Sequence, residues 1–411
     1  MYRFFLVLLC CLALGAEAQS SFPLSDSARI SLMTVAPGAF VYSTFGHSAL
    51  RVHDPLQRFD RVYNYGTFNF DQPNFLLKFC QGRLLYYLDV ESYRSFEYGN
   101  LYDRRPMREQ VLNLRADSRQ RLFDLLQENA REENRYYKYE FFYDNCATRI
   151  RDIVKETFFH QITFDSSGLP PGKTMRQLLH QYLTDKPWTG FGIDLVLGTP
   201  ADRLARAEDY MFLPDYVHDM FARASIDDST RLVRAERRIP ERPLPGTDTG
   251  AAGFWDSPFL VMCLVALLGL LCMANPRTEY MFDLLFWFTL GLAGLVMLLL
   301  WVATDHTATK TNWNLLWALP THLLYFWRRT RSEWVENYFL GAGILAALTL
   351  IFWAFLPQAL PLAAVPIAAL VVVKAIWRRY WKKDTIEAEV EQSRTPQWVG
   401  KHWLNNFSSR L

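Results

Sequence analysis

An excess of charge of either sign is missing from this 411-residue chain. Its 44 lysines and arginines almost balance its 42 aspartates and glutamates, which leaves a formal net charge of +2. A chain without a basic excess lacks the long-range field that draws a protein to nucleic acid, and a chain without an acidic excess is unlike highly charged disordered chains. The composition therefore argues against a nucleic-acid-binding protein.

Cysteine is scarce as well, and the patterns of common ligand sites are missing. The chain has six cysteines, and none of them stands with a histidine at the spacing of a structural zinc site. The glycine patterns of P-loops and of dinucleotide-binding turns are also lacking. We predict neither a bound metal nor a cofactor.

Apolar residues are plentiful but unevenly placed. They make up 50% of the chain, yet the mean hydropathy is only -0.04, because the parts before and after residue 256 differ. The first part is charged and rich in tyrosine, whereas the second consists mostly of long apolar runs. This contrast predicts a globular domain attached to a membrane domain.

The first 18 residues have the pattern of a secretory signal peptide. Arg3 precedes an apolar run at residues 4–14, and Ala16 and Ala18 put small side chains where signal peptidase cuts. We predict cleavage before Gln19, so that the following domain is periplasmic. The alternative is an uncleaved membrane anchor.

Residues 19–230 are predicted to form a mixed α/β domain. Apolar patterning predicts four extended segments, and apolar residues at helical spacing predict two helices followed by two shorter ones. The extended segments are 38–54, 61–68, 84–90 and 109–114, and the helices are 117–133, 145–158 and two within 199–224. Prolines and glycines are frequent in residues 231–257, which predicts a linker.

Five apolar runs follow the linker and predict an all-α, five-span membrane domain at 258–383. They are residues 259–274, 280–303, 313–327, 338–356 and 360–377. The third run is short and contains Pro320 and His322, but five crossings put nearly all the loop arginines and lysines on the cytoplasmic side. Residues 384–411 then form a cytoplasmic tail. Asp283, inside the second run, is costly in lipid and is predicted to face protein, water or the interface.

Two short stretches carry residues suited to catalysis. His47 lies on a predicted extended segment, and Cys146 lies in the first turn of a predicted helix, with Asp144 or Asn145 as the cap. Free N–H groups and the positive end of the helix dipole stabilise a thiolate there, and a nearby imidazole can act as its base. Two alternatives stay open: Cys146 is a buried apolar residue of the helix, or it forms a disulfide with Cys80.

Five segments of the chain closely resemble the Lnb type of lipoprotein N-acyltransferase. They are residues Tyr42–Arg51, Asn64–Phe70, Phe141–Arg149, Met211–Asp215 and, in the membrane part, His306–Trp317. The resemblance implies a permuted papain-like (NlpC-like) α+β domain on a multi-span domain in the bacterial inner membrane. It also implies transfer of an acyl chain from a phospholipid, through a cysteine thioester, to the α-amino group of a diacylglyceryl-cysteine lipoprotein.

The same resemblance implies roles for single residues. Cys146 and His47 match the family's motif positions, which makes them the catalytic nucleophile and base. In this fold the next extended segment supplies a group that orients the histidine, for which Asn64 is the first candidate and Tyr65 the second. His306 and Lys310, before the third apolar run, are expected either to bind the phospholipid headgroup or to form an ordinary interfacial polar loop.

Two other functions fit these residues. A membrane-anchored, NlpC-like peptidoglycan amidase or peptidase would apply the same thiol chemistry to another substrate. A non-enzymatic periplasmic assembly module would need no free thiol, and a disulfide between Cys146 and Cys80 would favour it. The five apolar runs favour a lipid substrate, because a wall hydrolase needs at most one anchor.

Overall fold

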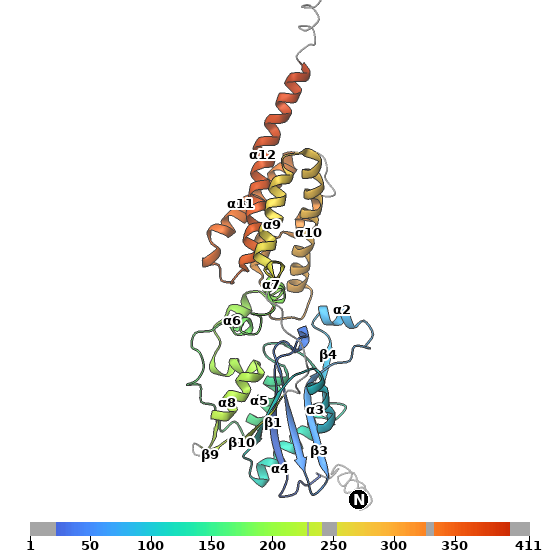
Figure 1. Ribbon diagram of the computed structural model, residues 1–411, viewed down its shortest axis with the longest axis vertical. Helices are drawn as coiled ribbons and strands as arrows, with labels where there is room; N and C mark the ends of the chain where they lie inside the picture. Colours follow the sequence, from blue (N-terminus) through green and yellow to red (C-terminus); the bar gives the residue numbers. More distant parts are fainter. Residues whose placement is uncertain (1–21, 228–229, 241–252, 326–332, 395–411) are drawn as a thin grey trace, which may run out of the picture. The chain divides into compact units, whose positions relative to one another are not determined.

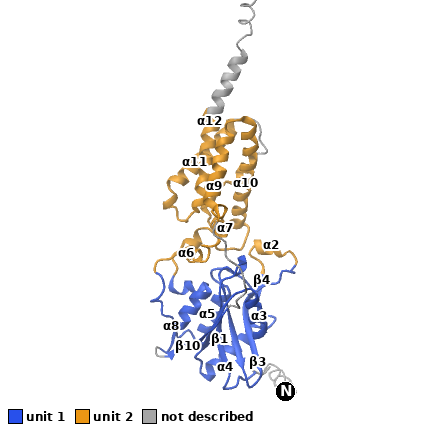
Figure 2. Cartoon of the chain, viewed as in Figure 1, with its two compact units in different colours: residues 1–72, 85–170, 206–244 blue, residues 73–84, 171–205, 245–411 orange. Residues whose placement is uncertain are grey.

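The computed structural model describes residues 22–227, 230–240, 253–325 and 333–394 (Figure 1). The predicted signal peptide lies outside the described residues, as do the middle of the predicted linker and the end of the predicted tail. The chain divides into two compact units (Figure 2). The sheet unit comprises residues 1–72, 85–170 and 206–244, and the helical unit comprises residues 73–84, 171–205 and 245–411.

A seven-stranded antiparallel sheet forms the centre of the sheet unit, with the strand order β10-β5-β1-β2-β3-β4-β6. Its strands are β1 (Arg29–Val35), β2 (His47–Asp54), β3 (Phe59–Thr67), β4 (Leu85–Ser92), β5 (Met107–Leu112), β6 (Tyr136–Lys138) and β10 (Val233–Ile239). A small second sheet joins β7 (Ile162–Thr163), β8 (Ser225–Ile226) and β9 (Thr230–Arg231).

Helices cover both faces of the large sheet, because successive side chains of a strand point to opposite faces. Leu32 of β1 packs on one face in a core that α4, α5 and α8 complete, whereas Val35 packs on the other face against α3. The helical segments of the unit are α3 (Tyr93–Tyr102), α4 (Ala116–Asn129), α5 (Cys146–Thr157), α8 (Pro214–Arg223) and the 3-10 turns η1 (Val41–Ser43) and η3 (Ala207–Phe212).

Most of the predicted elements of this domain are confirmed. The extended segments at 61–68, 84–90 and 109–114 and the helices at 117–133 and 145–158 correspond to β3, β4, β5, α4 and α5. Residues 38–54 are extended only from His47 onward, after the η1 turn. The predicted mixture of strands and helices therefore describes this unit correctly.

Strand β10 differs from the linker predicted to begin at residue 231. Residues 233–239 pair with β5 at the edge of the sheet, and most of their side chains are exposed. An edge strand with exposed side chains needs no apolar alternation, and charged residues there discourage pairing with another chain. This explains why the charged sequence of β10 does not carry a strand pattern.

Four long helices dominate the helical unit. The helices α10 and α11 are long and apolar enough to cross a membrane, with hydropathies of 2.3 and 1.4, and α9 is a shorter apolar helix. The elements are α2 (Phe75–Cys80), α6 (Met175–His180), α7 (Pro187–Val196), η2 (Thr199–Asp202), η4 (Phe254–Asp256), α9 (Pro258–Cys272), α10 (Pro276–Val302), α11 (Glu333–Ile351), η7 (Trp353–Phe355), η8 (Leu362–Ala364) and α12 (Val365–Arg394).

The third apolar run does not form a single helix in its described part. It folds as two 3-10 segments, η5 (Trp313–Leu316) and η6 (Pro320–Tyr325), because Pro320 cannot continue a helix. Both segments pack against α10, where a Cβ on Gly294 would come within 2.1 Å of the Ala318 carbonyl oxygen. The predicted helical crossing is thus replaced by irregular backbone that is covered by protein.

Asp283, the acidic residue within the second apolar run, forms an ion pair inside the helical unit. Asp283 of α10 is 6% exposed, and its carboxylate lies 2.5 Å from the ammonium of Lys374 in α12, which is 4% exposed. A buried charge needs such a partner. Of the three surroundings predicted for Asp283, namely protein, water or the interface, the structure shows protein.

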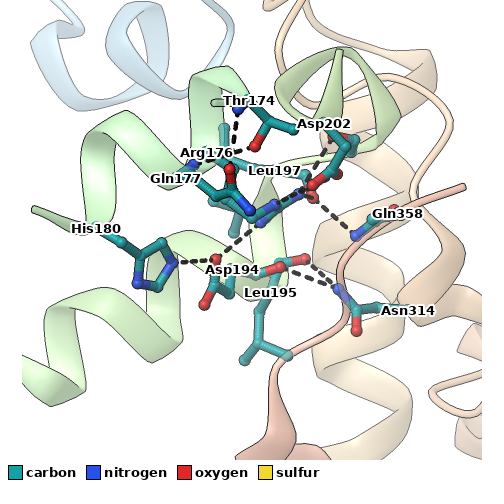
Figure 3. A network of polar contacts seen from close by, with 12 residues as sticks. Thr174, Arg176, Gln177, His180, Asp194, Leu195, Leu197, Asp202, Asn314 and Gln358 are labelled. Atoms are coloured by element: carbon teal, nitrogen blue, oxygen red, sulfur yellow. Dashed lines mark hydrogen bonds and ion pairs between the residues drawn. The ribbon is translucent and has the colours of Figure 1, made fainter. Parts of the chain in front are cut away.

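Residues 171–205, which the sequence places in the 19–230 domain, belong to the helical unit, where Arg176 anchors them (Figure 3). Its guanidinium donates hydrogen bonds to Asp194 at 2.8 Å and to both carboxylate oxygens of Asp202 at 2.9 Å. Its side chain is 4% exposed. A bidentate, buried arginine of this kind fixes the α6 and α7 segment in one geometry.

The carbonyl groups at the C-terminal end of α7 are satisfied by amides of η5 (Trp313–Leu316) and of the loop between η7 and η8 (Figure 3). Asn314 donates to the carbonyls of Asp194 and Leu195 at 3.1 and 3.2 Å, and Gln358 donates to that of Leu197 at 2.9 Å. The final carbonyls of a helix have no partner within it, so buried ones need such donors.

We predict that Arg176→Ala destabilises the helical unit by about 3–5 kcal/mol, because it removes the buried cation that the carboxylates of Asp194 and Asp202 share. Thermal unfolding of the full-length protein in detergent measures this loss. Arg206→Ala is the matched control, since the Arg206 side chain is 86% exposed and its pair with Asp209 spans 3.7 Å. A loss that is equal in the two variants contradicts the anchoring role of Arg176.

Candidate active site

Cys146 is the first residue of α5, and a capping box holds that end of the helix. The Asn145 side chain accepts hydrogen bonds from the N–H groups of Ala147 and Thr148 at 2.8 and 2.9 Å. The amide of the same residue donates to Phe141 and Phe212 carbonyls, which ties the cap to two other segments. The cap predicted at Asp144 or Asn145 is supplied by Asn145, and Cys146 is held 8% exposed at the N-terminal end of the helix.

His47 is the first residue of β2 and is held from behind by Asn64 of β3. The Nε2 atom of its ring lies 2.5 Å from Oδ1 of Asn64, and the Asn64 amide lies 3.4 Å from a carboxylate oxygen of Glu91. Gly46 lets the chain enter the strand with a φ of 78°, where a Cβ would lie 2.9 Å from the Val35 carbonyl oxygen. Since Asn64 occupies Nε2, Nδ1 is the ring nitrogen left for a thiol.

The structure brings Cys146 and His47 into hydrogen-bonding contact, and each changes the ionisation of the other. Burial alone would raise the pKa of Cys146, but the charge and hydrogen bond of His47 and the N–H groups of Ser48 and Ala147 lower it below its ordinary value. Burial alone would lower the pKa of His47, but Cys146 and Asn64 raise it. The opposite shifts favour a thiolate–imidazolium pair.

This arrangement suits nucleophilic catalysis. A thiolate is the reactive form of cysteine, a protonated imidazole beside it can protonate a leaving group, and Asn64 fixes the ring that does so. Cys80 and Cys146 are both free cysteines, and Cys146 lies at the edge of an apolar core. Cys146 is therefore buried but also has a histidine partner. An inert cysteine of the core would not need such a partner.

Tyr65, the second candidate to orient the histidine, has other partners. Its hydroxyl accepts a hydrogen bond from Asn129 at 2.9 Å, and its ring meets that of Tyr137. Burial raises the pKa of Tyr65 to about 12. Neighbouring residues of a strand point to opposite faces, so Asn64 reaches His47 while Tyr65 enters the core.

His306 and Lys310 lie in the helical unit and bond to backbone carbonyls. The Lys310 ammonium donates to the carbonyls of Trp301 and Thr304 at 2.6 Å each, next to the end of α10. A ring nitrogen of His306 lies 3.1 Å from the carbonyl of Phe79. A cation at a helix C-terminus stabilises the unpaired carbonyls there.

Glu91 was not predicted as part of the site. It lies on β4, opposite Val62 of β3, and reaches Asn64 only because the two strands pair in that register. The sequence near Glu91 carries no motif, so strand pairing is the only signal that leads to it.

Two family models match the chain. The Lnb N-terminal periplasmic domain matches residues 18–181, and the Lnb transmembrane domain matches residues 252–385. Together the two matches cover well over half of the chain. No curated protein and no solved structure matches it.

We predict that the pH midpoint for alkylation of Cys146 by iodoacetamide lies below the ordinary thiol pKa of about 8.5. In His47→Ala the burial of Cys146 stays while the stabilising charge is lost, so the midpoint should rise by at least about one pH unit. Mass spectrometry of the Cys146 peptide across a pH series measures both midpoints. Identical midpoints in the two proteins contradict the pairing.

The pH profile of Cys146 alkylation also distinguishes Asn64 from Tyr65 as the residue of β3 that orients His47. Asn64→Ala removes the acceptor behind the imidazole and should lower the plateau rate, whereas Tyr65→Phe removes only a hydroxyl bonded to Asn129 and should leave the profile unchanged. A larger effect of the tyrosine variant would reverse this assignment.

Proposed function

Since the chain belongs to the Lnb family of lipoprotein N-acyltransferases and contains both the periplasmic and the transmembrane domain of that family, we propose that it N-acylates lipoproteins through a thioester on Cys146. One observation carries the proposal: Cys146 lies at the capped start of α5 next to His47, whose ring Asn64 holds from the other side at 2.5 Å. The histidine strand precedes the cysteine helix in the chain, which fits a permuted papain-like domain.

In the first half-reaction the Cys146 thiolate attacks the carbonyl carbon of a phospholipid ester. A C–S bond forms and the ester C–O bond breaks, and the His47 imidazolium gives its proton to the departing lysophospholipid oxygen. The N–H group of Ser48, which helps to lower the pKa of Cys146, is suited to stabilise the negative oxygen of the tetrahedral intermediate.

In the second half-reaction the free α-amino group of a diacylglyceryl-cysteine lipoprotein attacks the thioester. The N–C bond of an amide forms, the C–S bond breaks, and the neutral His47 takes the proton of the amine. The thiolate and the imidazolium are then both restored. Asn64 holds the ring in the same orientation through both steps.

The helical unit supports this choice of substrates. Both are held in a bilayer by acyl chains, and exposing each methylene to water costs about 0.8 kcal/mol. An enzyme in the same bilayer avoids that cost, and α10 and α11 are long and apolar enough to anchor it. We place the enzyme in the bacterial inner membrane, with the sheet unit in the periplasm and the C-terminus in the cytoplasm, as the basic loops favour.

Five crossings remain our proposal for the topology, with η5 and η6 as the third. Irregular backbone is tolerated at membrane depth where protein covers it, and Asn314 and His322 in this run are both fully buried. For His306 and Lys310 the contacts with carbonyl groups favour an ordered polar loop over headgroup binding.

We predict that cells in which Cys146→Ala replaces the native protein make lipoproteins that keep the diacylglyceryl group and lose the N-acyl chain. Without the sulfur no thioester forms, so the loss should be essentially complete. Mass spectrometry of lipoprotein N-termini measures it, and Cys80→Ala, which changes an exposed cysteine, is the matched control.

Normal N-acylation in the Cys146→Ala cells, with no second N-acyltransferase present, contradicts the proposal. Altered muropeptides with intact N-acylation would favour the peptidoglycan amidase instead.

A further inference from the structure

A buried arginine lies at the same end of the large sheet as His47. Arg105 stands two residues before β5, and Val35 of β1 pairs with His47 on one side and with Met107 on the other. One residue beyond this pairing, the Ala36 N–H donates a hydrogen bond to the Pro106 carbonyl at 2.9 Å, so the pairing of the two chain segments continues up to Arg105. The strand pairing therefore brings Arg105 to the end of the sheet where the reactive pair lies.

The guanidinium of Arg105 has an unused donor. The residue is 8% exposed, its Nε donates to the Ala36 carbonyl at 2.9 Å, and Nη1 makes a long contact of 3.5 Å with Asn100. Nη2 is buried and has no hydrogen-bond partner within the described residues. A buried cation without an acceptor is costly, and at a reactive site the substrate commonly supplies the missing acceptor.

The charges of Arg105 and the reactive pair act on each other. Arg105 is among the groups that lower the pKa of His47, against the larger effects of Cys146 and Asn64. Burial lowers the pKa of Arg105 itself, and Asp103, Tyr42 and the Cys146 thiolate offset part of that effect. The guanidinium thus lies near enough to the reactive pair for its charge to be felt there.

An exposed apolar turn lies beside the arginine. Phe40, Val41 and Tyr42 are 56%, 67% and 62% exposed, and the two aromatic rings stack at 5.5 Å. A Cβ on Gly38 would meet Cδ of Arg105 at 3.0 Å, which shows that the arginine stem passes against this segment. A buried cation next to exposed apolar side chains suits an amphipathic anion better than a polar peptide.

We propose that Arg105 binds the phosphate of the glycerophospholipid donor and so selects it over neutral glycerolipids. The inference rests on the proposed acyl transfer. The phosphate and the acyl esters of such a lipid are carried by one glycerol, so a phosphate on Nη2 brings the esters to the end of the sheet where the reactive pair lies. The Phe40–Tyr42 turn then contacts the apolar part of the lipid.

The first test compares donors in detergent micelles with the full-length protein. The wild type should prefer phosphatidylglycerol to diacylglycerol, as measured by kcat/KM for release of the deacylated glycerolipid. Arg105→Gln should raise KM for phosphatidylglycerol about ten- to a hundredfold, with a smaller change in kcat, because a charge-assisted hydrogen bond is lost. Turnover of diacylglycerol should not fall, and Arg105→Lys should restore part of the preference.

Arg94→Gln, on the exposed side of α3, removes the same charge and should keep the wild-type preference. A wild type without preference, or an Arg105→Gln variant that keeps it, overturns the inference.

A second test needs no acyl transfer and stays informative if the proposed function fails. Iodoacetate is an anion and iodoacetamide is neutral, and both alkylate the same thiolate. Arg105→Gln should lower the ratio of the iodoacetate rate to the iodoacetamide rate at Cys146 about tenfold, since a nearby cation is lost. An unchanged ratio overturns the anion site, and a lowered ratio with an unchanged lipid preference overturns the assignment to the donor phosphate.

Discussion

The proposed reactivity of this protein depends on the charge balance around one sulfur atom. Burial at the start of α5 works against ionisation of Cys146, and two groups reverse that effect: the His47 ring and the N–H groups of Ser48 and Ala147. These groups come from β2 and from the helix itself, so the packing of α5 on the sheet is a condition for reactivity. The capping box of Asn145 fixes the helix end, and Asn64 fixes the imidazole. Each serves the same pair from a different element, as preorganised catalytic sites require.

In the helical unit, too, buried polar groups are held by partners from several different segments. Apolar helices suit a bilayer, but the segment at 171–205 carries buried charges at Arg176 and Asp194 and must be joined to these helices without leaving unpaired groups. Arg176 neutralises two buried carboxylates, and Asn314 and Gln358 occupy the free carbonyls of α7. The pair between Asp283 and Lys374 does the same within the long helices. Buried polar groups are costly individually, so this satisfied network specifies one geometry for the segment.

Local patterns in the sequence predict the central elements and the reactive pair, whereas long-range pairing decides the rest. Asn145 before an apolar stripe is enough to predict the start of α5, and the motif around His47 is enough to suggest a base. The choice between Asn64 and Tyr65 depends on which face of β3 each side chain takes, and a shift of one residue inverts it. Strand register, which the sequence does not reveal, is what brings Arg105 and Glu91 to this end of the sheet. The charged edge strand β10 and the 3-10 segments η5 and η6 could not be predicted because their sequences show no helical or strand periodicity.

The most direct test of the central claim is to look for the acyl group on the sulfur. Purified full-length protein in detergent is incubated with phosphatidylethanolamine of known chains and no acceptor, and the Cys146 peptide is analysed by mass spectrometry. The account predicts the mass of one acyl chain on Cys146, removable by neutral hydroxylamine and transferred when a diacylglyceryl peptide is added. A Cys146 that stays unmodified while the same preparation N-acylates that peptide would contradict it.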